Sequence, residues 1–329
     1  MASLTALSPS AHNSNQHLPQ GVYANLDNLL RTRFTASKLN LKFPRPSKAL
    51  LSGPIRTRFK GRGMEFEEVR VYQPGDDIRT IDWRVTARTQ VTHTKLFQEE
   101  REKPVLLVVD QRSTMFFGSQ QCFKSVYAAH LATTLGWAAL HQNDRIGALI
   151  FGDNEQKDLR PRRSKHAQLN LIHEIIAFNH ALTSPVAQQQ AQSLQELLTD
   201  ALRVAKPGTK VFILSDFHDF SEDCEKSLHL LARHNDVALF QIYDQLERSW
   251  PQASQLYVSN GKEQMRVDGK AKDFHKRYEQ QFQQRRTALQ NCANRLAISL
   301  IDACVQHDPD RLLTSLFGKT KDRSKASRL

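Results

Sequence analysis

From residue 104 onward, short apolar runs alternate with longer stretches in which apolar residues recur at helical spacing. Runs such as PVLLVVD are typical of strands buried on both faces of a parallel sheet. Strands that alternate with helices in this way predict an α/β fold, a doubly wound sheet flanked by helices. The expected strands are 104–110, 145–152, 210–216, 237–244 and 297–303, and the expected helices are 123–142, 165–178, 193–205, 222–235 and 273–294.

The part of the chain before residue 104 has a different pattern. Leu26, Leu29 and Leu30 recur at helical spacing, which predicts a helix near residues 22–35. Short alternating runs between residues 56 and 99, divided by turn residues, predict a small antiparallel β unit. The expected organisation is a disordered N-terminus (1–20), a helix with the β unit (21–103), the α/β domain (104–318) and a basic C-terminal tail (319–329).

Composition narrows the class of protein. No stretch approaches the roughly 18 uninterrupted apolar residues of a membrane-spanning helix. The polar first twenty residues lack the pattern of a signal peptide, so we expect a cytoplasmic protein. The four cysteines form no CxxC pair, which favours neither a disulfide framework nor a zinc site.

The net charge of +12 lies at the two ends of the chain. Residues 1–63 carry +9 and residues 311–329 carry +5, so the central body is close to neutral at −2. Basic ends can bind nucleic acid, but they are more often solvated tails. Because no nucleic-acid-binding motif accompanies them, we do not expect nucleic acid as the main partner.

Two of the expected strands end in aspartate, at Asp110 and at Asp216. Ligands bind outside the carboxyl ends of strands in open α/β sheets. Carboxylates and hydroxyls are hard oxygen ligands that suit Mg²⁺. We therefore consider a metal site made of Asp110, Thr114 and Asp216, with Ser113 and Ser215 as further ligands. The alternative is that both aspartates only cap the helices that follow them.

These strand ends resemble the metal-ion-dependent adhesion site of the von Willebrand factor A fold, which reads Asp-x-Ser-x-Ser. Asp110 matches the first aspartate, Thr114 the second hydroxyl and Asp216 the late aspartate. Arg112 stands where the first serine belongs. A guanidinium so close to Asp110 repels a metal ion and pairs with carboxylates itself, so Arg112 is an alternative to the metal.

The stretch GRGMEFEEVRVYQPGDDIRTIDW, residues 61–83, is dense in charge. Pro74 and Gly75 predict a tight turn, and nearby arginines are expected to form ion pairs with the aspartates. We expect Ile78, Ile81 and Trp83 to dock on the α/β domain. The network locks the β unit in place, forms a surface for a partner or, as a third alternative, takes part in catalysis through its aspartates and His93. Its members are Arg70, Tyr72, Gly75, Asp76, Asp77, Arg79, Asp82 and Trp83, with Arg112 of the α/β domain.

That stretch, followed by the Asp110 strand, resembles the bacterial domain of unknown function 58 family over roughly residues 22–318. The family's hallmark run is present as Arg70, Tyr72, Gly75, Asp76, Asp77, Arg79, Ile81, Asp82 and Trp83. Members are typically encoded beside AAA+ ATPases of the MoxR type and other von Willebrand A proteins. The resemblance therefore implies a chaperone-like role with such partners in protein maturation or complex assembly.

No catalytic motif is evident. GRG at residues 61–63 is not completed to a GxGxxG pattern, and the GKT at 318–320 lacks the first glycine of a Walker A loop, so we expect no bound nucleotide. We expect a non-enzymatic interaction adaptor or co-chaperone. The alternatives are a metal-dependent hydrolase centred on Asp110 and Asp216, or nucleic-acid binding through the basic ends. The basic run at residues 160–165 is interpreted as a solvated loop or a contact for an acidic partner.

Overall fold

The computed structural model describes residues 19–41, 64–99, 103–183, 192–249, 256–259, 264–267 and 272–318. The chain divides into a larger unit of Met1–Pro44 with Lys103–Leu329, here called the sheet unit, and a smaller one of Arg45–Glu102, the hairpin unit. The predictions of a disordered start (up to residue 18) and of a basic tail at 319–329 lie outside the described residues.

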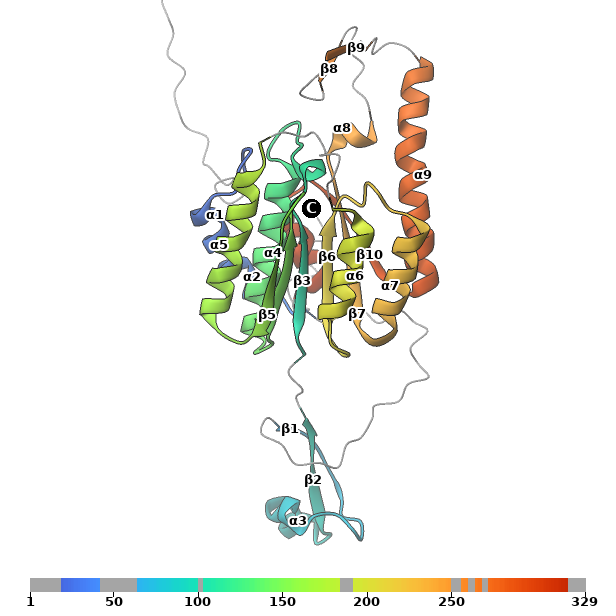
Figure 1. The fold of residues 1–329 in the computed structure, drawn as a ribbon. Coiled ribbons are helices and arrows are strands. Elements are labelled where there is room, and N and C mark those ends of the chain that lie inside the picture. Colours follow the sequence, from blue (N-terminus) through green and yellow to red (C-terminus); the bar gives the residue numbers. More distant parts are fainter. Residues whose placement is uncertain are drawn as a thin grey trace, which may run out of the picture. The chain divides into compact units, whose positions relative to one another are not determined.

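The sheet unit is built on a six-stranded, mostly parallel sheet (Figure 1). Its strand order is β10-β7-β6-β3-β4-β5, and only β5 runs antiparallel to its neighbour. The central strands are buried on both faces because their side chains are apolar in succession rather than in alternation. The strands are β3 (Val105–Asp110), β4 (Ile146–Phe151), β5 (Gln156–Arg162), β6 (Lys210–Ser215), β7 (Asp236–Tyr243) and β10 (Ser299–Cys304).

Helices cover both faces of this sheet (Figure 1). This confirms the prediction of an α/β sheet flanked by helices. One face carries α1 (Leu26–Arg31), α2 (Arg33–Ala36), α4 (Lys124–His141), α5 (Lys165–Ala181) and α10 (Pro309–Phe317). The other carries α6 (Leu194–Val204), α7 (Glu222–His234) and α9 (Lys272–Leu296). None of the helices in the described ranges combines the length and the apolar character needed to cross a membrane.

Helix α4 is the central helix of its face. It is apolar or small almost all the way round, and its residues from Lys124 to Ala139 are buried. A helix with this pattern needs cover on every side. The sheet supplies one side, and α1, α2, α5 and α10 supply the others. The chain segments on either side of α4 are therefore fixed in position, which places the start of α4 beside the ends of the strands.

The N-terminal helices belong with the sheet and not with the β unit. The prediction placed them in one domain with the β unit, at residues 21–103, whereas the structure places Met1–Pro44 in the sheet unit. Leu29 and Ala36 are buried in the same core as α4. The buried side chain of Asn179 on α5 accepts a hydrogen bond from the backbone N–H of Ala24 at 2.7 Å. Burial of the apolar face of α1 and α2 requires a larger partner than a two-stranded hairpin.

The hairpin unit pairs β1 (Met64–Val71) with β2 (His93–Glu99) in antiparallel register, with a bulge between Phe66 and Glu68. This confirms the predicted antiparallel pair. Between the strands lie a 3₁₀ turn, η2 (Ile78–Thr80), and a helix, α3 (Trp83–Thr89), which the alternating pattern of WRVTART does not predict. The local signal for α3 is Asp82, whose side chain caps the helix.

The basic run at residues 160–165 is not a loop. Residues 156–162 form β5 at one edge of the sheet, and Lys165 begins α5. This strand is mostly exposed and contains Pro161, both of which are common in edge strands and weaken the sequence signal. Three further short elements, α8 (Gln245–Arg248), β8 (Leu256–Ser259) and β9 (Gln264–Val267), lie between β7 and α9.

Candidate functional site

The candidate site lies at the carboxyl ends of β3 and β6, which are neighbours in the sheet. Val109 pairs with Leu214 in the parallel register, so the next residues along the two strands, Asp110 and Ser215, meet. The hydroxyl of Ser215 donates a hydrogen bond to Asp110 Oδ2 at 2.6 Å. The sheet register therefore brings together two of the residues that the sequence singled out.

Arg112 fills the space beside Asp110. Its Nη2 lies 2.9 Å from Asp110 Oδ2, and its Nε lies 3.1 Å from Asp110 Oδ1. The opposite side of the guanidinium faces Asp219, with Nη1–Oδ2 and Nη2–Oδ1 distances of 2.9 and 3.0 Å. Nη1 also donates to the backbone carbonyl of Gln192 at 3.0 Å. One side chain thus connects the end of β3, the segment before α6 and the loop after β6.

The inner part of this ion-pair cluster is withdrawn from water, whereas Asp219 at its outer side is exposed. Asp110 is fully buried and Arg112 is 3 % exposed. Burial alone lowers the pKa of Arg112, but the charges and hydrogen bonds of Asp110 and Asp219 reverse this effect and raise the pKa above its ordinary value. The pKa of Asp219 is lowered: burial raises it, and its bonds and ion pair with Arg112 more than offset that effect. Arg112 and Asp219 are therefore both charged at neutral pH.

Lys124 is a second buried cation at the same edge of the sheet. Its ammonium group donates to Asp216 Oδ2 at 2.9 Å and to Glu247 Oε1 at 2.7 Å. Although burial lowers the pKa of Lys124, the negative charges of Asp216 and Glu247 raise it above the ordinary value. Burial likewise raises the pKa of Asp216, but Lys124 overcomes this and brings it to about 2. Asp216 therefore pairs with a lysine that the sequence analysis did not consider.

The backbone after β6 is unusual where it forms this site. Phe217 adopts a left-handed conformation with φ of 52°, although its side chain is bulky and only 2 % exposed. Its N–H is accepted by the hydroxyl of Ser215 at 3.1 Å, and the N–H of His218 is accepted by Asp216 Oδ1 at 3.1 Å. Such backbone costs about 1–3 kcal/mol and persists only where surrounding contacts enforce it.

The carboxylates do not fit the predicted magnesium site. Both oxygens of Asp110 already accept hydrogen bonds from Arg112, and one also accepts the hydroxyl of Ser215. Asp216 is held by Lys124. A divalent cation here would have to displace a buried guanidinium and lie close to an ammonium group. Across the described ranges, no group of three or more His, Cys, Asp or Glu side chains is arranged to hold a metal ion.

The predicted hydroxyl ligands are not all directed at Asp110. Ser113 donates through both its N–H and its hydroxyl to Asp153 Oδ1, at 3.0 and 3.1 Å. The hydroxyl of Thr114 is buried and makes no hydrogen bond within the part of the chain that the structure describes. Of the predicted set, Arg112 and Ser215 are therefore both bonded to Asp110. Ser113 and Thr114 are not bonded to Asp110 within the described residues.

Sequence reasoning missed Asp219, Lys124 and Glu247. Asp219 could have been identified from the sequence, because it stands three residues after Asp216 in the same loop. Lys124 also carried a signal: a lysine at the first position of a helix opposes the helix dipole and is expected only where acidic groups compensate it. Glu247 had no comparable signal, since it comes from a short helix more than a hundred residues away.

The charged run of the hairpin unit is a set of caps and turns more than a network of arginine pairs. Gly75 has φ of 101°, as the predicted tight turn requires, and Arg70 pairs with Asp76 at 2.7 Å. The side chain of Asp77 accepts the backbone N–H of Arg79. The prediction of an arginine partner for Asp82 is wrong, because its ion-pair partner is Lys95 on β2, at 3.4 Å.

Other side chains of this stretch make only a long hydrogen bond or are exposed to solvent. The Tyr72 hydroxyl is 3.4 Å from the carbonyl of Asp76, at the long limit of a hydrogen bond. Within the hairpin unit the apolar side chains of Ile78 and Trp83 are 66 % and 68 % exposed. Their predicted docking on the α/β domain stays a prediction. The described residues of the unit leave most of the surface of both side chains uncovered.

We predict that Arg112→Met lowers the free energy of unfolding by about 3–5 kcal/mol, because it leaves Asp110 buried without its cation. Urea unfolding followed by circular dichroism would measure this change. The exposed Arg203→Met is the control, with an expected change within about 0.5 kcal/mol. The double variant Arg112→Met/Asp110→Asn should be more stable than the single variant, since it removes the uncompensated charge. A loss below about 1 kcal/mol in the single variant would show that the pair is not important.

The pair of Asp216 and Lys124 should make stability depend on pH. The pKa of Asp216 falls from its ordinary 3.8 to about 2 in the folded chain. The pair therefore stabilises the fold fully above about pH 4, and this contribution is lost as the pH falls toward about 2. We predict that the difference in unfolding free energy between the natural protein and Asp216→Asn is largest at neutral pH and shrinks at acidic pH. A difference that stays constant with pH would contradict the assignment.

Comparison with known proteins places the chain in a family. The model of the family described as "Protein of unknown function DUF58" matches residues 68–288. Uncharacterized protein Rv1480 of Mycobacterium tuberculosis and uncharacterized protein Mb1516 of Mycobacterium bovis are each 29 % identical over 202 residues, which is 61 % of this chain and 61 % of each relative.

A crystal structure of the conserved hypothetical protein BatB from Bacteroides thetaiotaomicron aligns with 69 % of this chain and all of its own length, at 12 % identity and a TM-score of 0.39. The likeness is too low to add to the argument. The family match covers most of the chain, including both the hairpin unit's GDDIRTIDW run and the carboxyl-edge site. The protein therefore belongs to the DUF58 family.

Proposed function

We propose that this protein is a non-enzymatic interaction adaptor or co-chaperone that works with a MoxR-type AAA+ ATPase in protein maturation or complex assembly, in the cytoplasm. The observation that carries the proposal is the exposure of Trp83 and Ile78 on a hairpin unit with a well-bonded backbone. The kind of ATPase, and other von Willebrand A proteins as further partners, come from the family resemblance of the GDDIRTIDW run.

Trp83 is well placed to anchor a partner. It is the first residue of α3, and the helix start is held by Asp82, whose side chain accepts the N–H groups of Arg84 and Val85 at 3.0 and 3.1 Å. The bond from Val85 is the largest of the effects that lower the pKa of Asp82. An aromatic side chain on a fixed backbone loses little entropy on binding, and tryptophan is common among residues that dominate interfaces.

The chemistry of the sheet unit favours binding over catalysis. Asp110 and Asp216, the candidate catalytic carboxylates, are neutralised by buried cations. Burial raises the pKa of the thiols of Cys122 and Cys292 to about 12 and about 11, so neither is a reactive thiolate at neutral pH. No observation favours the metal-dependent hydrolase. Nucleic-acid binding by the basic ends concerns mainly residues outside the described ranges.

The sheet order and its flanking helices are compatible with a von Willebrand A-like fold in which Arg112 takes the place of the metal. In metal-dependent members of that fold the ion attracts a carboxylate of the partner. Here Asp219 already occupies the outer side of the guanidinium. We therefore expect partner contacts of this protein to be independent of a metal bound at Asp110.

The test is a pull-down from native lysate in the presence of nuclease and Mg-ATP, with bound proteins identified by mass spectrometry. The natural protein should recover an AAA+ ATPase, and Trp83→Ala/Ile78→Ala should recover at least about tenfold less of it, as expected for loss of interface anchors. Phe34→Ala is the matched control, because Phe34 is 61 % exposed but lies on the sheet unit. Failure of the natural protein to recover an ATPase, or equal recovery by all three proteins, would contradict the proposal.

A further inference from the structure

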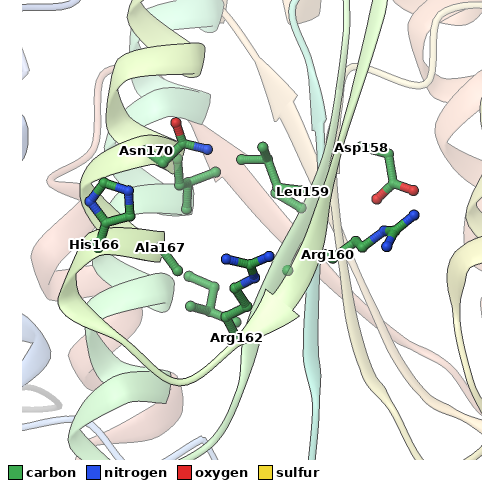
Figure 2. A pocket seen from close by; sticks show the side chains of 11 residues that line it. Asp158, Leu159, Arg160, Arg162, His166, Ala167 and Asn170 are labelled. Carbon is green, nitrogen blue, oxygen red and sulfur yellow. The ribbon is translucent and has the colours of Figure 1, made fainter.

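A cavity of about 410 Å³ lies between the N-terminal half of α5 and the edge of the sheet formed by β5 (Figure 2). Strand β10 forms the opposite edge of the sheet. Its lining comes from β4, β5 and α5. It is separate from the carboxyl-edge site, and no lining residue takes part in the ion pairs of Arg112 or Lys124. We call it the edge groove.

The edge groove is produced by a bulge in the antiparallel pair β4–β5. Ile146 is opposite Arg162 and Ala148 is opposite Leu159, so the register shifts by one residue between them. At Gly147, between the two, a Cβ atom would lie 2.8 Å from the carbonyl oxygen of Leu159. A glycine is therefore needed where the bulged strand crosses β4 so closely.

The bulge determines which side chains face α5. In a regular strand, residues three apart point to opposite faces of the sheet. Leu159 and Arg162 instead both face α5, because their partners Ala148 and Ile146 belong to the core on that side. Figure 2 shows this arrangement: Leu159 and Arg162 extend toward α5, whereas Asp158 and Arg160 extend to the other side of the strand.

The groove combines an apolar floor with a cationic rim. Leu171 is buried and Leu159 is half-buried, and they form part of the floor. Arg162 is exposed at the rim, and within the described part of the chain no carboxylate forms an ion pair with it. His166 and Asn170 of α5 add polar groups opposite Arg162 (Figure 2). The start of α5 contributes the positive end of its dipole at the same place.

We propose that the edge groove binds an acidic segment of a partner protein, with a carboxylate on Arg162 and an adjacent apolar side chain over Leu159. A guanidinium at the rim of an apolar floor matches a ligand that carries both groups. Nucleic acid fits less well, because no Phe, Tyr or Trp side chain is among the lining residues to stack on a base.

A protein segment fits better than a small free acid. The groove opens beside β5, the last strand in the sheet order, whose outer backbone groups can pair with an extended chain on either side of Pro161. A free acid would use the rim cation alone, in contact with water. The inference rests on the proposed function in one respect, namely that the chain acts through protein contacts.

The test is fluorescence polarisation with a fluorescein-labelled peptide of alternating glutamate and leucine, and a second peptide with glutamine in place of glutamate. The natural protein should bind the acidic peptide, and Arg162→Glu should weaken binding by about tenfold or more, as expected for loss of a charge-assisted hydrogen bond. Arg160→Glu is the matched control: it makes the same change of net charge on the same strand, and although Arg160 also belongs to the lining, its side chain extends to the other side of the strand from Arg162 (Figure 2). It should bind within about twofold of the natural protein.

Three outcomes would overturn the proposal. They are no binding of the acidic peptide by the natural protein up to about 1 mM, equal loss of binding in both arginine variants, or displacement of the peptide by oligothymidylate more effectively than by unlabelled acidic peptide. Displacement of the labelled peptide by glutarate, at a concentration equal to or lower than that of unlabelled acidic peptide, would also overturn the proposal, because the groove would then be a site for free acids. The assay contains no ATPase, so it can fail or succeed independently of the pull-down with the Trp83 and Ile78 variants.

Discussion

The buried guanidinium of Arg112 is the constraint on which the carboxyl edge of the sheet depends. It joins Asp110 at the end of β3 with Asp219 after β6 and the carbonyl of Gln192 before α6. Withdrawing these charges from water costs several kcal/mol per ion, and only complete pairing offsets that cost. The three segments are therefore held together, because moving the end of β3 or the loop after β6 would remove a negative charge from the buried guanidinium, and moving the segment before α6 would remove a hydrogen-bond acceptor.

Lys124 extends the same principle to the next loop. Together with Arg112 it provides two positive charges inside a group of acidic side chains, in the region where related sheets bind ligands. A divalent cation at this site would have to compete with Arg112 and Lys124 for the carboxylates. The lowered pKa values of Asp216 and Asp219 make these two carboxylates weak proton acceptors at neutral pH. In the proposed function, binding uses exposed surfaces, namely Trp83 and Ile78 on the hairpin unit and the edge groove beside β5.

The sequence predicted the buried strands well, because β3, β4 and β6 are continuous apolar runs whose burial leaves little choice of structure. It did not predict β5 or α3, whose residues are mostly polar and whose formation depends on neighbours: β5 needs the edge of β4, and α3 needs the cap from Asp82. Register and burial decide such elements, and neither can be read from a short polar segment.

The candidate site was also predictable only where a local sequence signal marked its residues. Asp110, Ser215 and Asp216 follow from the ends of strands, and the position of Arg112 suggested that it would pair with them. Their other partners come from distant segments, as with Glu247 for Lys124, or from the facing strand, as with Lys95 for Asp82. Only the folded chain brings such distant groups together. For these two ion pairs the sequence alone therefore does not identify the partner.

The most direct test of the central claim is a crystal structure grown with Mn²⁺ at about 10 mM, a concentration that would fill a weak carboxylate site, with anomalous diffraction collected for the metal. We predict a guanidinium between Asp110 and Asp219 and no anomalous peak beside Asp110 or Asp216. A manganese ion bound to Asp110, with Arg112 turned away from it, would contradict the account.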